Sequence, residues 1–404
     1  MMFVLDDARA RRFEPFSTSR PLSEMRVGAL LQRQRWQQVL QTSVLGHISS
    51  PHLAGFEEFD APPHHEGDVP AGAWLVNSRA VPTLLPALSA ATVLIIEQQV
   101  AAVRLAAPVA QEQLHDPQFT LDDVLPGTGS MATIPGLWLE EVWDIVGQLQ
   151  TLLLRDIPAL VPALSARQLS QDGVTVLGDH GVFVADGATV EPHVVFDTTA
   201  GPVLLCQGAS VQAFSRVVGP CFVGESSAIL GGRVSGCSIG EVCRVHGEVS
   251  VTTFVGHANK GHDGFVGHSV LGRWVNLGAG TTTSNLKNTY GTVSLWTPDG
   301  LVDTGMQFLG TLFGDHAKTG IGLRLTTGCV VGTGANVYDS MPPKAVAPFS
   351  WGGSVPYAEF GVDKFVDMAE RMMARRQVLL SDRPRRWWRT LHAVATADLR
   401  WPRR

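Results

Sequence analysis

The sequence predicts an α/β domain followed by a left-handed parallel β-helix of hexapeptide repeats, with a helix and a basic tail at the end. The first observation is that Val266, Leu271 and Leu277 are each followed directly by Gly. An apolar residue followed by Gly, recurring every five to six residues, is typical of hexapeptide repeats. The second is composition, because the 404 residues include 42 Gly and most of the excess lies after residue 170. The third is that strand-like and helical patterns alternate before that point, which favours an α/β layer structure.

Residues 1–160 are predicted to form the α/β domain. The chain begins with a short buried strand at 2–6, followed by a polar loop and an amphipathic helix at 22–40. Further strand-like runs occupy 44–48, 73–76 and 93–97, with a Pro-bounded helical piece at 81–88. A second helix is predicted at 136–156, and the Pro-containing segment 156–169 after it is predicted to be a linker.

Residues 173–340 are predicted to form the β-helix, in roughly nine coils. Apolar hexad positions can be followed through this range, with an irregular excursion around 288–310. β-Helices of this kind have flat faces that stack side by side, and three such faces close symmetrically. A homotrimer is therefore expected, with binding sites between neighbouring chains.

Residues 341–404 complete the chain with a predicted helix at 362–380 and a basic tail. The tail from Arg383 to Arg404 carries seven Arg against one Asp, together with Trp387, Trp388 and Trp401. We expect a partly ordered surface arm that packs its Trp side chains on the protein. Contact with an anion or a membrane surface is the alternative that the composition leaves open.

Composition limits the possible functions and the location. A net charge of -6 gives no reason to expect nucleic acid as the main partner. The five Cys are an odd number without a CxxC pair, which predicts buried free thiols and a reducing, cytoplasmic location. No apolar run reaches the roughly 18 residues of a membrane span, and the N-terminus lacks the apolar core of a signal peptide.

The stretch 256–291 concentrates the polar chemistry of the repeat region. His262, Asn276 and Asn285 lie within it and have no obvious structural task. A His or Asn at a coil corner often only hydrogen-bonds the backbone, so His262 alone leaves a structural role open. The segment as a whole favours a functional site.

Residues 259–288, NKGHDGFVGHSVLGRWVNLGAGTTTSNLKN, resemble the acetyltransferase domain of the bifunctional N-acetylglucosamine-1-phosphate uridyltransferase/glucosamine-1-phosphate acetyltransferase family. That family shows a Gly-His dipeptide, an apolar-Gly step and the text VNIGAGT, followed closely by an Asn. The counterparts here are Gly261-His262, Val266-Gly267, residues 275–281 and Asn285, without a gap. The order of domains also matches, and the N-terminus resembles an alternative branch with a shortened, divergent first domain.

The resemblance implies roles for individual residues. His262 would be the general base that takes a proton from the substrate amine as the amine attacks the thioester of acetyl-CoA. Asn276 would contact the sugar phosphate, and Asn285 would line the cleft shared by sugar and acetyl-CoA. The basic candidates nearest to the family's phosphate-binding and lysine positions are Arg244, Lys260 and Lys287. Main-chain amides of the Gly-rich turns would hold the CoA phosphates and the developing oxyanion. The residues expected to bind acetyl-CoA are Gly280, Ile321 and Thr333.

Two substitutions depart from the family pattern. Phe265 and Leu286 stand where the family has tyrosines. The catalytic base therefore transfers to this chain better than the sugar specificity does, and another amino-sugar phosphate than glucosamine 1-phosphate stays open.

The N-terminal domain resembles a sugar nucleotidyltransferase whose phosphate-binding loop has changed. The family's Gly-rich loop corresponds to residues 5–12, which contain no Gly. Arg12 and Arg20 could still bind nucleotide phosphates, and Asp6 or Asp7 could hold Mg²⁺. An active domain, using UTP or dTTP, and a degenerate or regulatory domain are both consistent with these residues.

Three functions follow, in order of preference. The first is an enzyme of sugar-nucleotide biosynthesis that N-acetylates an amino-sugar 1-phosphate, with glucosamine 1-phosphate favoured and nucleotidyl transfer as a possible second activity. The second is a non-catalytic trimeric β-helix scaffold. The third is nucleotidyl transfer alone.

Overall fold

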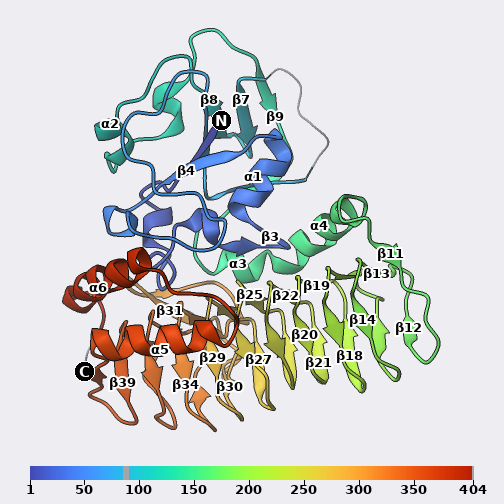
Figure 1. Cartoon of the computed structure of the whole chain (residues 1–404). Helices are drawn as coiled ribbons and strands as arrows, with labels where there is room; N and C mark the ends of the chain where they lie inside the picture. Colours follow the sequence, from blue (N-terminus) through green and yellow to red (C-terminus); the bar gives the residue numbers. More distant parts are fainter. Residues whose placement is uncertain (85–90, 403–404) are drawn as a thin grey trace.

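The apolar runs at the start of the chain assemble into one mixed six-stranded sheet in the computed structural model, which describes residues 1–84 and 91–402 (Figure 1). In spatial order the strands are β4 (Val44–Ile48), β1 (Met2–Leu5), β5 (Trp74–Asn77), β8 (Gln99–Arg104), β7 (Val93–Ile96) and β9 (Met131–Thr133). β1 is parallel to β4 and β5, whereas β8 is antiparallel to β5 and β7. The four strands predicted in this domain are confirmed.

Side chains alternate between the two faces along each strand, and both faces of this sheet are buried in apolar clusters. On one side Met2 and Val4 pack with Trp36 of helix α1 (Gln32–Leu40). On the other side Phe3 and Leu5 join a second apolar cluster that includes Leu114 of α2 (Gln111–His115). Short 3-10 helices complete the domain: η1 (Ala10–Arg12), η2 (Leu22–Glu24), η3 (Pro51–Leu53) and η4 (Leu121–Val124).

The helix predicted at 22–40 is wrong over its first half. Residues 22–31 form η2 and a short hairpin, β2 (Arg26–Val27) and β3 (Leu30–Leu31), and only 32–40 are helical. Gly28 in the hairpin turn has φ +66° and lies so close to Asp156 that a Cβ would be 2.3 Å from its carboxylate. Asp156 in turn accepts hydrogen bonds from the Ala29 amide (2.9 Å) and from Arg35 (2.6 Å). This tertiary ion pair overrides the helical pattern.

The prediction for 136–169 is also wrong in its boundaries. Residues 136–138 form β10 (Gly136–Trp138), which pairs with β6 (Ala80–Pro82), and the helices are α3 (Asp144–Gly147) and α4 (Leu149–Ala163). The predicted linker is therefore mostly the second half of α4, which contains Pro158 and Pro162. Leu149, Leu153 and Ile157 bury one stripe of α4 in an apolar cluster, and this packing sustains the helix. The helical piece predicted at 81–88 begins in strand β6, and its residues 85–88 lie outside the described residues.

The repeat region forms a parallel β-solenoid with three faces, which confirms the predicted β-helix. The first face has β13 (Val182–Val184), β16 (Val203–Leu205), β19 (Cys221–Val223), β22 (Ser238–Ile239), β25 (Thr253–Phe254), β28 (Val270–Leu271), β33 (Thr311–Phe313), β36 (Cys329–Val331) and β38 (Ala345–Val346), and β11 (Arg167–Gln168) is added antiparallel at its end.

The second face follows the first along each coil. It has β14 (Thr189–Val190), β17 (Ser210–Val211), β20 (Ala228–Ile229), β23 (Arg244–Val245), β26 (Asn259–Lys260), β29 (Asn276–Leu277), β34 (Lys318–Thr319), β37 (Asn336–Val337) and β39 (Ser350–Gly352), with β40 (Ala358–Glu359) antiparallel at its end. The third face has β12 (Thr175–Leu177), β15 (Val195–Asp197), β18 (Ser215–Val218), β21 (Gly232–Ser235), β24 (Glu248–Ser250) and β27 (Phe265–Gly267), continued by β30 (Thr282–Thr283) and β35 (Arg324–Leu325).

The interior of the solenoid is a single apolar core. Inward side chains stack in columns of Val, Ile, Leu and Cys along its length. All five Cys are buried and free, as the sequence predicts. The predicted excursion around 288–310 is confirmed as a loop that carries the hairpin β31 (Ser294–Thr297) and β32 (Gly300–Asp303).

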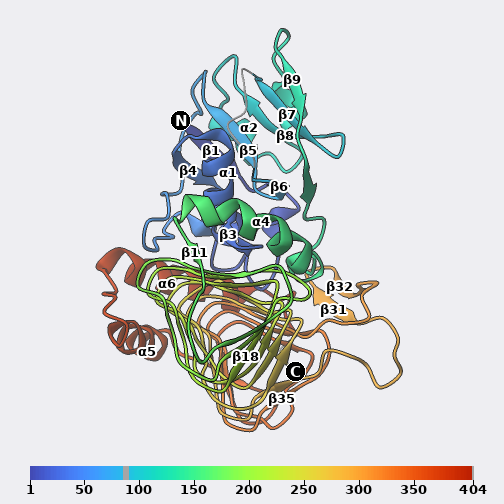
Figure 2. The same ribbon diagram turned by 90° about the vertical axis from the view of Figure 1, so that its right-hand side faces the viewer.

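The N-terminal domain and α4 cover the first face of the solenoid (Figure 2). Outward residues of that face, including Val270, Leu312 and Val330, share one apolar cluster with Phe13 and Met25 of the N-terminal domain. The two parts of the chain are therefore joined by a hydrophobic interface.

Two helices end the described chain, and they correct the prediction for the tail. Helix α5 (Val362–Ala374) confirms the predicted helix but ends six residues earlier than 380. Most of the described tail is a regular helix, α6 (Asp382–Ala397), and over these residues the expectation of a partly ordered arm is wrong. Trp387 and Trp388 are buried beside α5, and Trp401 stacks on Trp296, with 3.9 Å between ring centroids, as the packing prediction requires. Among the described residues, helices long and apolar enough to cross a bilayer are absent.

Candidate functional site

His262 lies at the corner where the solenoid turns from its second to its third face. Residues Gly261 to Gly264 make this turn between β26 and β27. The strand register places Ala279 and Ile321 at the same corner of the next two coils. Main-chain hydrogen bonds connect the stack, from the Gly280 amide to the Asp263 carbonyl (2.8 Å) and from the Gly322 amide to the Ala279 carbonyl (2.7 Å). We call His262, Ala279 and Ile321 the open corner.

The imidazole of His262 is exposed and uncommitted. Within the described chain its ring makes no hydrogen bond or ion pair, and only its carbonyl oxygen is used, by Lys260. An exposed imidazole without partners has the chemistry of a general base. Nothing in the local structure explains His262 as a structural residue.

Two of the predicted binding groups, the Lys260 ammonium and the Gly280 amide, already make hydrogen bonds within the solenoid. Lys260 points inward, is 1% exposed, and donates from Nζ to the His246 carbonyl (2.8 Å) and to the His262 carbonyl. Burial lowers the pKa of Lys260 to about 8. The Gly280 amide donates to Asp263, as described above, whereas the Ile321 side chain is 83% exposed at the open corner.

Asn276 lies on the second face, beside the open corner. Its Oδ1 accepts a hydrogen bond from Asn259 Nδ2 (3.3 Å), and Asn259 Oδ1 accepts one from Arg376 Nη2 (2.8 Å). Arg244 is on the same face, one coil before Asn259. The structure thus places Arg244 and Asn276 on one face, two coils apart, and it adds Arg376 and Asn259, which were not predicted.

Asn285 lies across the third face from His262. Its Nδ2 is 2.8 Å from His268 Nδ1, and the His268 ring stacks on Phe308, with 5.3 Å between centroids. Burial lowers the pKa of His268. Lys287 follows two residues later and is close enough to Lys344 for its charge to add to burial in lowering the pKa of Lys344. Within one chain Asn285 and Lys287 therefore belong to a different corner from His262.

Phe265 and Arg324 project from the third face between these two corners. Phe265 is half-buried, and its ring and the Asn285 amide both lie over Gly267, where an added Cβ would be 2.5 Å and 2.8 Å from them. Arg324 is exposed two coils further along. The third face therefore presents an aromatic ring and a cation between the His262 and Asn285 corners.

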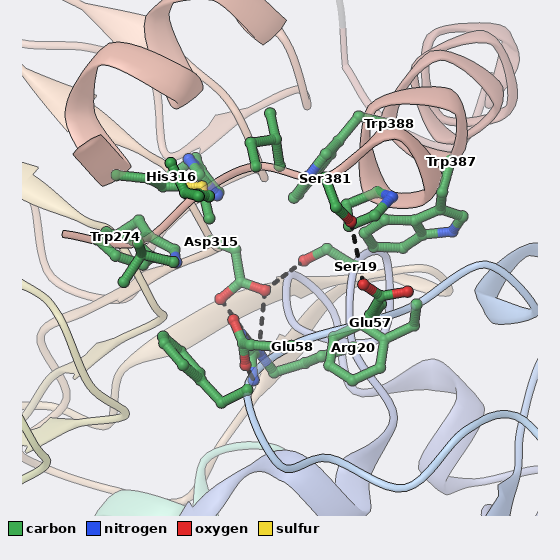
Figure 3. Close-up of a pocket in the computed structure, with 17 residues that line it drawn as sticks. Ser19, Arg20, Glu57, Glu58, Trp274, Asp315, His316, Ser381, Trp387 and Trp388 are labelled. Carbon is green, nitrogen blue, oxygen red and sulfur yellow. Dashed lines mark hydrogen bonds and ion pairs between the residues drawn. The ribbon is translucent and has the colours of Figure 1, made fainter. Parts of the chain in front are cut away.

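The corner between the first and second faces is the opposite of the open corner, because the N-terminal domain covers it. Figure 3 shows Ser19, Arg20 and Glu58 of that domain meeting Asp315. Arg20 Nε donates to Asp315 (2.9 Å), Ser19 Oγ donates to Asp315 (2.7 Å), and Arg20 Nη1 lies 3.0 Å from Glu58. We call the solenoid side chains here, Glu241, His257, Arg273 and Asp315, the covered corner.

The side chains of the covered corner come from four successive coils. Arg273 pairs with Glu58 (2.7 Å) and with Glu241, and Glu241 also pairs with Arg26 (2.8 Å). Burial opposes ionisation of Glu241, but Arg273 and Arg26 outweigh it and hold its pKa at about 2. Thr333 is buried at the same corner, where its Oγ1 contacts Ser19 Oγ (3.0 Å) and the Pro15 carbonyl (3.2 Å).

The covered corner borders a cavity of about 160 Å³, which α5 and α6 close from the other side (Figure 3). Trp274, His316, Trp387 and Trp388 line it. Arg20 and Thr333, predicted to bind nucleotide and acetyl-CoA, are thus placed in the interface between domains, with no group directed to the open corner.

The predicted nucleotide loop is internally paired. Asp7 accepts hydrogen bonds from Arg79 Nε (2.9 Å) and Asn77 Nδ2 (2.8 Å), and these partners outweigh burial and lower its pKa. Asp6 is 3% exposed and accepts from the Leu22 amide (3.1 Å), and burial raises its pKa to about 7. Arg12 is half-exposed and pairs with Asp299 of the β31–β32 hairpin.

These residues do not fit Mg²⁺ in this conformation. A divalent ion needs several converging oxygen ligands, but the Asp7 carboxylate already faces the Arg79 guanidinium and Asp6 is buried beneath it. Over residues 1–84 and 91–402 no group of three or more His, Cys, Asp or Glu side chains is arranged to hold a metal.

Sequence reasoning missed residues that pair with predicted ones. His268 lies within residues 259–288, six residues after His262, and this closeness in sequence could have identified it. Arg376 gave none, because it reaches Asn259 across 117 residues of sequence.

Comparison with known proteins bears on both halves of the chain. Residues 2–162 match the family described as sugar nucleotidyl transferase. A bifunctional protein GlmU of Desulfitobacterium hafniense is 28% identical over 208 residues, covering 44% of this chain and 42% of that protein. Another, of Carboxydothermus hydrogenoformans, is 23% identical over 269 residues, covering 59% of this chain and 56% of that protein. The matched regions thus span about half the length of these relatives.

One solved structure also matches part of the chain. It is AntD, an N-acyltransferase from Bacillus cereus in complex with dTDP-4-amino-4,6-dideoxyglucose and coenzyme A, at 12% identity and a TM-score of 0.21. The match covers 50% of this chain and 92% of that chain. A TM-score this low supports no conclusion about fold or function.

Proposed function

We propose that this chain is a transferase acting at the open corner. The premises are its relation to the bifunctional GlmU proteins and the match of residues 2–162 to a sugar nucleotidyltransferase domain. The reaction is transfer of the acetyl group of acetyl-CoA to the amine of an amino-sugar 1-phosphate, with glucosamine 1-phosphate as the favoured acceptor. The observation that carries the proposal is the exposed, uncommitted imidazole of His262.

In this reaction the amine nitrogen forms a bond to the thioester carbonyl carbon while His262 takes the amine proton. The carbon–sulfur bond then breaks, and the imidazolium returns the proton to the departing CoA thiolate. General-base catalysis of this kind contributes roughly 10² to 10⁴ in rate. In this proposal Ile321, which is exposed two coils along the same corner, contacts acetyl-CoA.

Asn285 requires a second chain in this mechanism. Because Asn285 and His262 lie at different corners of one solenoid, a shared cleft forms only where the third face of one copy meets another copy. We therefore include a homotrimer in the proposal. Sedimentation equilibrium should give three times the chain mass of 43.4 kDa.

The test is release of free thiol from acetyl-CoA in the presence of glucosamine 1-phosphate. Wild-type protein should release thiol, and His262→Ala should lower the rate by roughly 10² to 10⁴. His193→Ala is the matched control, since His193 is also an exposed His at a solenoid corner. Undiminished release from His262→Ala would remove His262 from the mechanism.

Nucleotidyl transfer is the second candidate function, and the family match of residues 2–162 favours it. The ion pairs of the loop at residues 5–12 must first break. Asp7 pairs with Arg79, and Arg9 pairs with Glu140 and Glu141. Pyrophosphate release from UTP or dTTP with a sugar 1-phosphate tests this activity. A protein without either activity and without saturable CoA binding would instead be the scaffold.

A further inference from the structure

The end of helix α5 meets the second face of the solenoid beside the open corner. Arg376, just beyond α5, donates from Nη2 to Asn259 Oδ1 at 2.8 Å. Asn259 Nδ2 donates to Asn276 Oδ1 at 3.3 Å. Arg376 is thereby linked through the Asn259 amide to Asn276, a position predicted to contact substrate.

The direction of these hydrogen bonds is fixed by the guanidinium, which can only donate. Asn259 must therefore turn its oxygen to Arg376 and its NH₂ to Asn276. Asn276 accepts with its oxygen, which leaves its own NH₂ uncommitted. The remaining N–H groups of Arg376 and the NH₂ of Asn276 are hydrogen-bond donors, so a ligand that binds them must supply acceptor atoms.

The second observation is unbalanced positive charge. Arg244 and Arg376 are both half-buried, and Arg244 donates from Nη1 only to the carbonyls of Ser226 (2.9 Å) and Cys243 (2.8 Å). Arg244 is the register partner of Asn259, and Arg376 donates to Asn259, so both arginines flank this residue on the second face. Burial lowers the pKa of Arg376, and the charges of Arg244 and Arg375 lower it further. Among the described residues none of these three arginines has a carboxylate within ion-pair distance.

At the covered corner, by contrast, the buried arginines are neutralised by carboxylates. Arg20, Arg26 and Arg273 each pair with one or two carboxylates. Half-buried arginines that repel one another are stable only if an anion or solvent compensates them. Arginine forks and amide donors together match the oxygens of a phosphate group.

The site is within reach of His262. Asn259 is three residues before His262 on the same coil, so their Cα atoms are at most about 10 Å apart. Gly261 between them lies over Arg244, with an added Cβ 4.0 Å from the Arg244 Cβ and nothing nearer. One small molecule could therefore bind here through a phosphate while its reacting group lies at His262.

We propose that Arg376 and Arg244, with the Asn276 amide oriented through Asn259, bind a phosphate group of a substrate on the second face. Arg376 and Asn259 are new binding residues, and α5 thereby becomes part of the site. The identity of the substrate rests on the proposed function. The phosphate of the amino-sugar acceptor and the phosphates of CoA share the required chemistry.

The first experiment measures anion binding without any turnover. Isothermal titration of the full-length protein with inorganic pyrophosphate should show saturable binding, weakened about tenfold or more in Arg376→Ala and in Arg244→Ala. Arg371→Ala is the matched control, because Arg371 is an exposed arginine on α5, and its affinity should equal that of wild type. Arg376→Gln can still donate to Asn259 but lacks the charge, and it should behave like Arg376→Ala.

The second experiment identifies the source of the phosphate. If the acceptor phosphate binds here, Arg376→Gln raises KM for glucosamine 1-phosphate about tenfold and leaves the Kd for CoA unchanged. If a CoA phosphate binds here, the Kd for CoA rises instead. Pyrophosphate affinity unchanged in Arg376→Gln and Arg244→Ala would overturn the inference. Arg376-dependent pyrophosphate binding by a protein that releases no thiol would support the inference and contradict the proposed function.

Discussion

The covered corner and the open corner are successive turns of the same coils of the solenoid, but they have opposite chemistry. At the covered corner Arg273 is 3% exposed and bound between Glu58 and Glu241. At the open corner His262 is exposed with no partner for its ring among the described residues. The difference is what lies above them, since the N-terminal domain closes over the first and leaves the second accessible. A polar residue at a coil corner is thus structural where the N-terminal domain buries it and available for function where it stays exposed.

Removing a charge from the covered corner should have the largest effect on stability. Arg273→Ala leaves Glu58 and Glu241 without their shared cation, which should cost about 3–5 kcal/mol of unfolding free energy. Arg233→Ala removes an exposed pair on the third face, Arg233 to Glu248 at 3.8 Å, and should cost about 0–1 kcal/mol. Urea denaturation of both variants measures the contrast, and equal losses would contradict it.

Acid should destabilise the covered corner through His257. Burial, with the Arg273 charge, lowers its pKa from 6.5 to about 4, although Glu241 and Glu58 oppose the shift. The unfolded state therefore binds a proton below pH 6.5 that the folded state refuses until about pH 4, so stability falls as pH falls through this window. Between pH 7 and 5 the loss from this residue should be about 2 kcal/mol.

The variant His257→Phe isolates this contribution from that of other buried histidines. Its ring can keep the stacking of His257 on Phe59 and Trp274 but cannot titrate. Denaturation midpoints at pH 7 and pH 5 should therefore differ less in the variant than in wild type. An identical pH dependence would show that His257 does not titrate as described.

Changes at the open corner should leave stability nearly unaltered while affecting turnover. Ile321→Ala removes a side chain that is 83% exposed, so the free energy of unfolding should change by less than about 0.5 kcal/mol. If Ile321 contacts acetyl-CoA, KM for acetyl-CoA should rise severalfold, as about 1 kcal/mol of lost apolar contact requires. An unchanged KM would place acetyl-CoA elsewhere.

The sequence predicted the solenoid better than the N-terminal helices, for a physical reason. The apolar-Gly period is local, and each coil repeats it, so the range 173–340 could be traced without knowing any tertiary contact. The break at Gly28 depends on Asp156, and the helix through Pro158 depends on burial of Leu153 and Ile157. Neither contact is visible in a local pattern.

The candidate site was predictable only where its residues are neighbours in sequence. His262 and Asn276 come from one segment, and the structure places them on adjoining parts of two coils. Arg20 and Thr333 have residue types suited to phosphate or cofactor binding, yet Arg20 pairs with Asp315 and Thr333 contacts Ser19 inside the domain interface. Burial and pairing, which cannot be read from the sequence, decide whether such a residue is accessible to a ligand or held inside the interface.

The initial rate of thiol release from acetyl-CoA and glucosamine 1-phosphate, measured for His262→Ala at saturating substrates, tests the contrast most directly. The open corner is catalytic if this rate falls by roughly 10² to 10⁴ while the urea midpoint equals that of wild type. A wild-type rate from His262→Ala would contradict that assignment. It would then leave the open corner without a function in acetyl transfer.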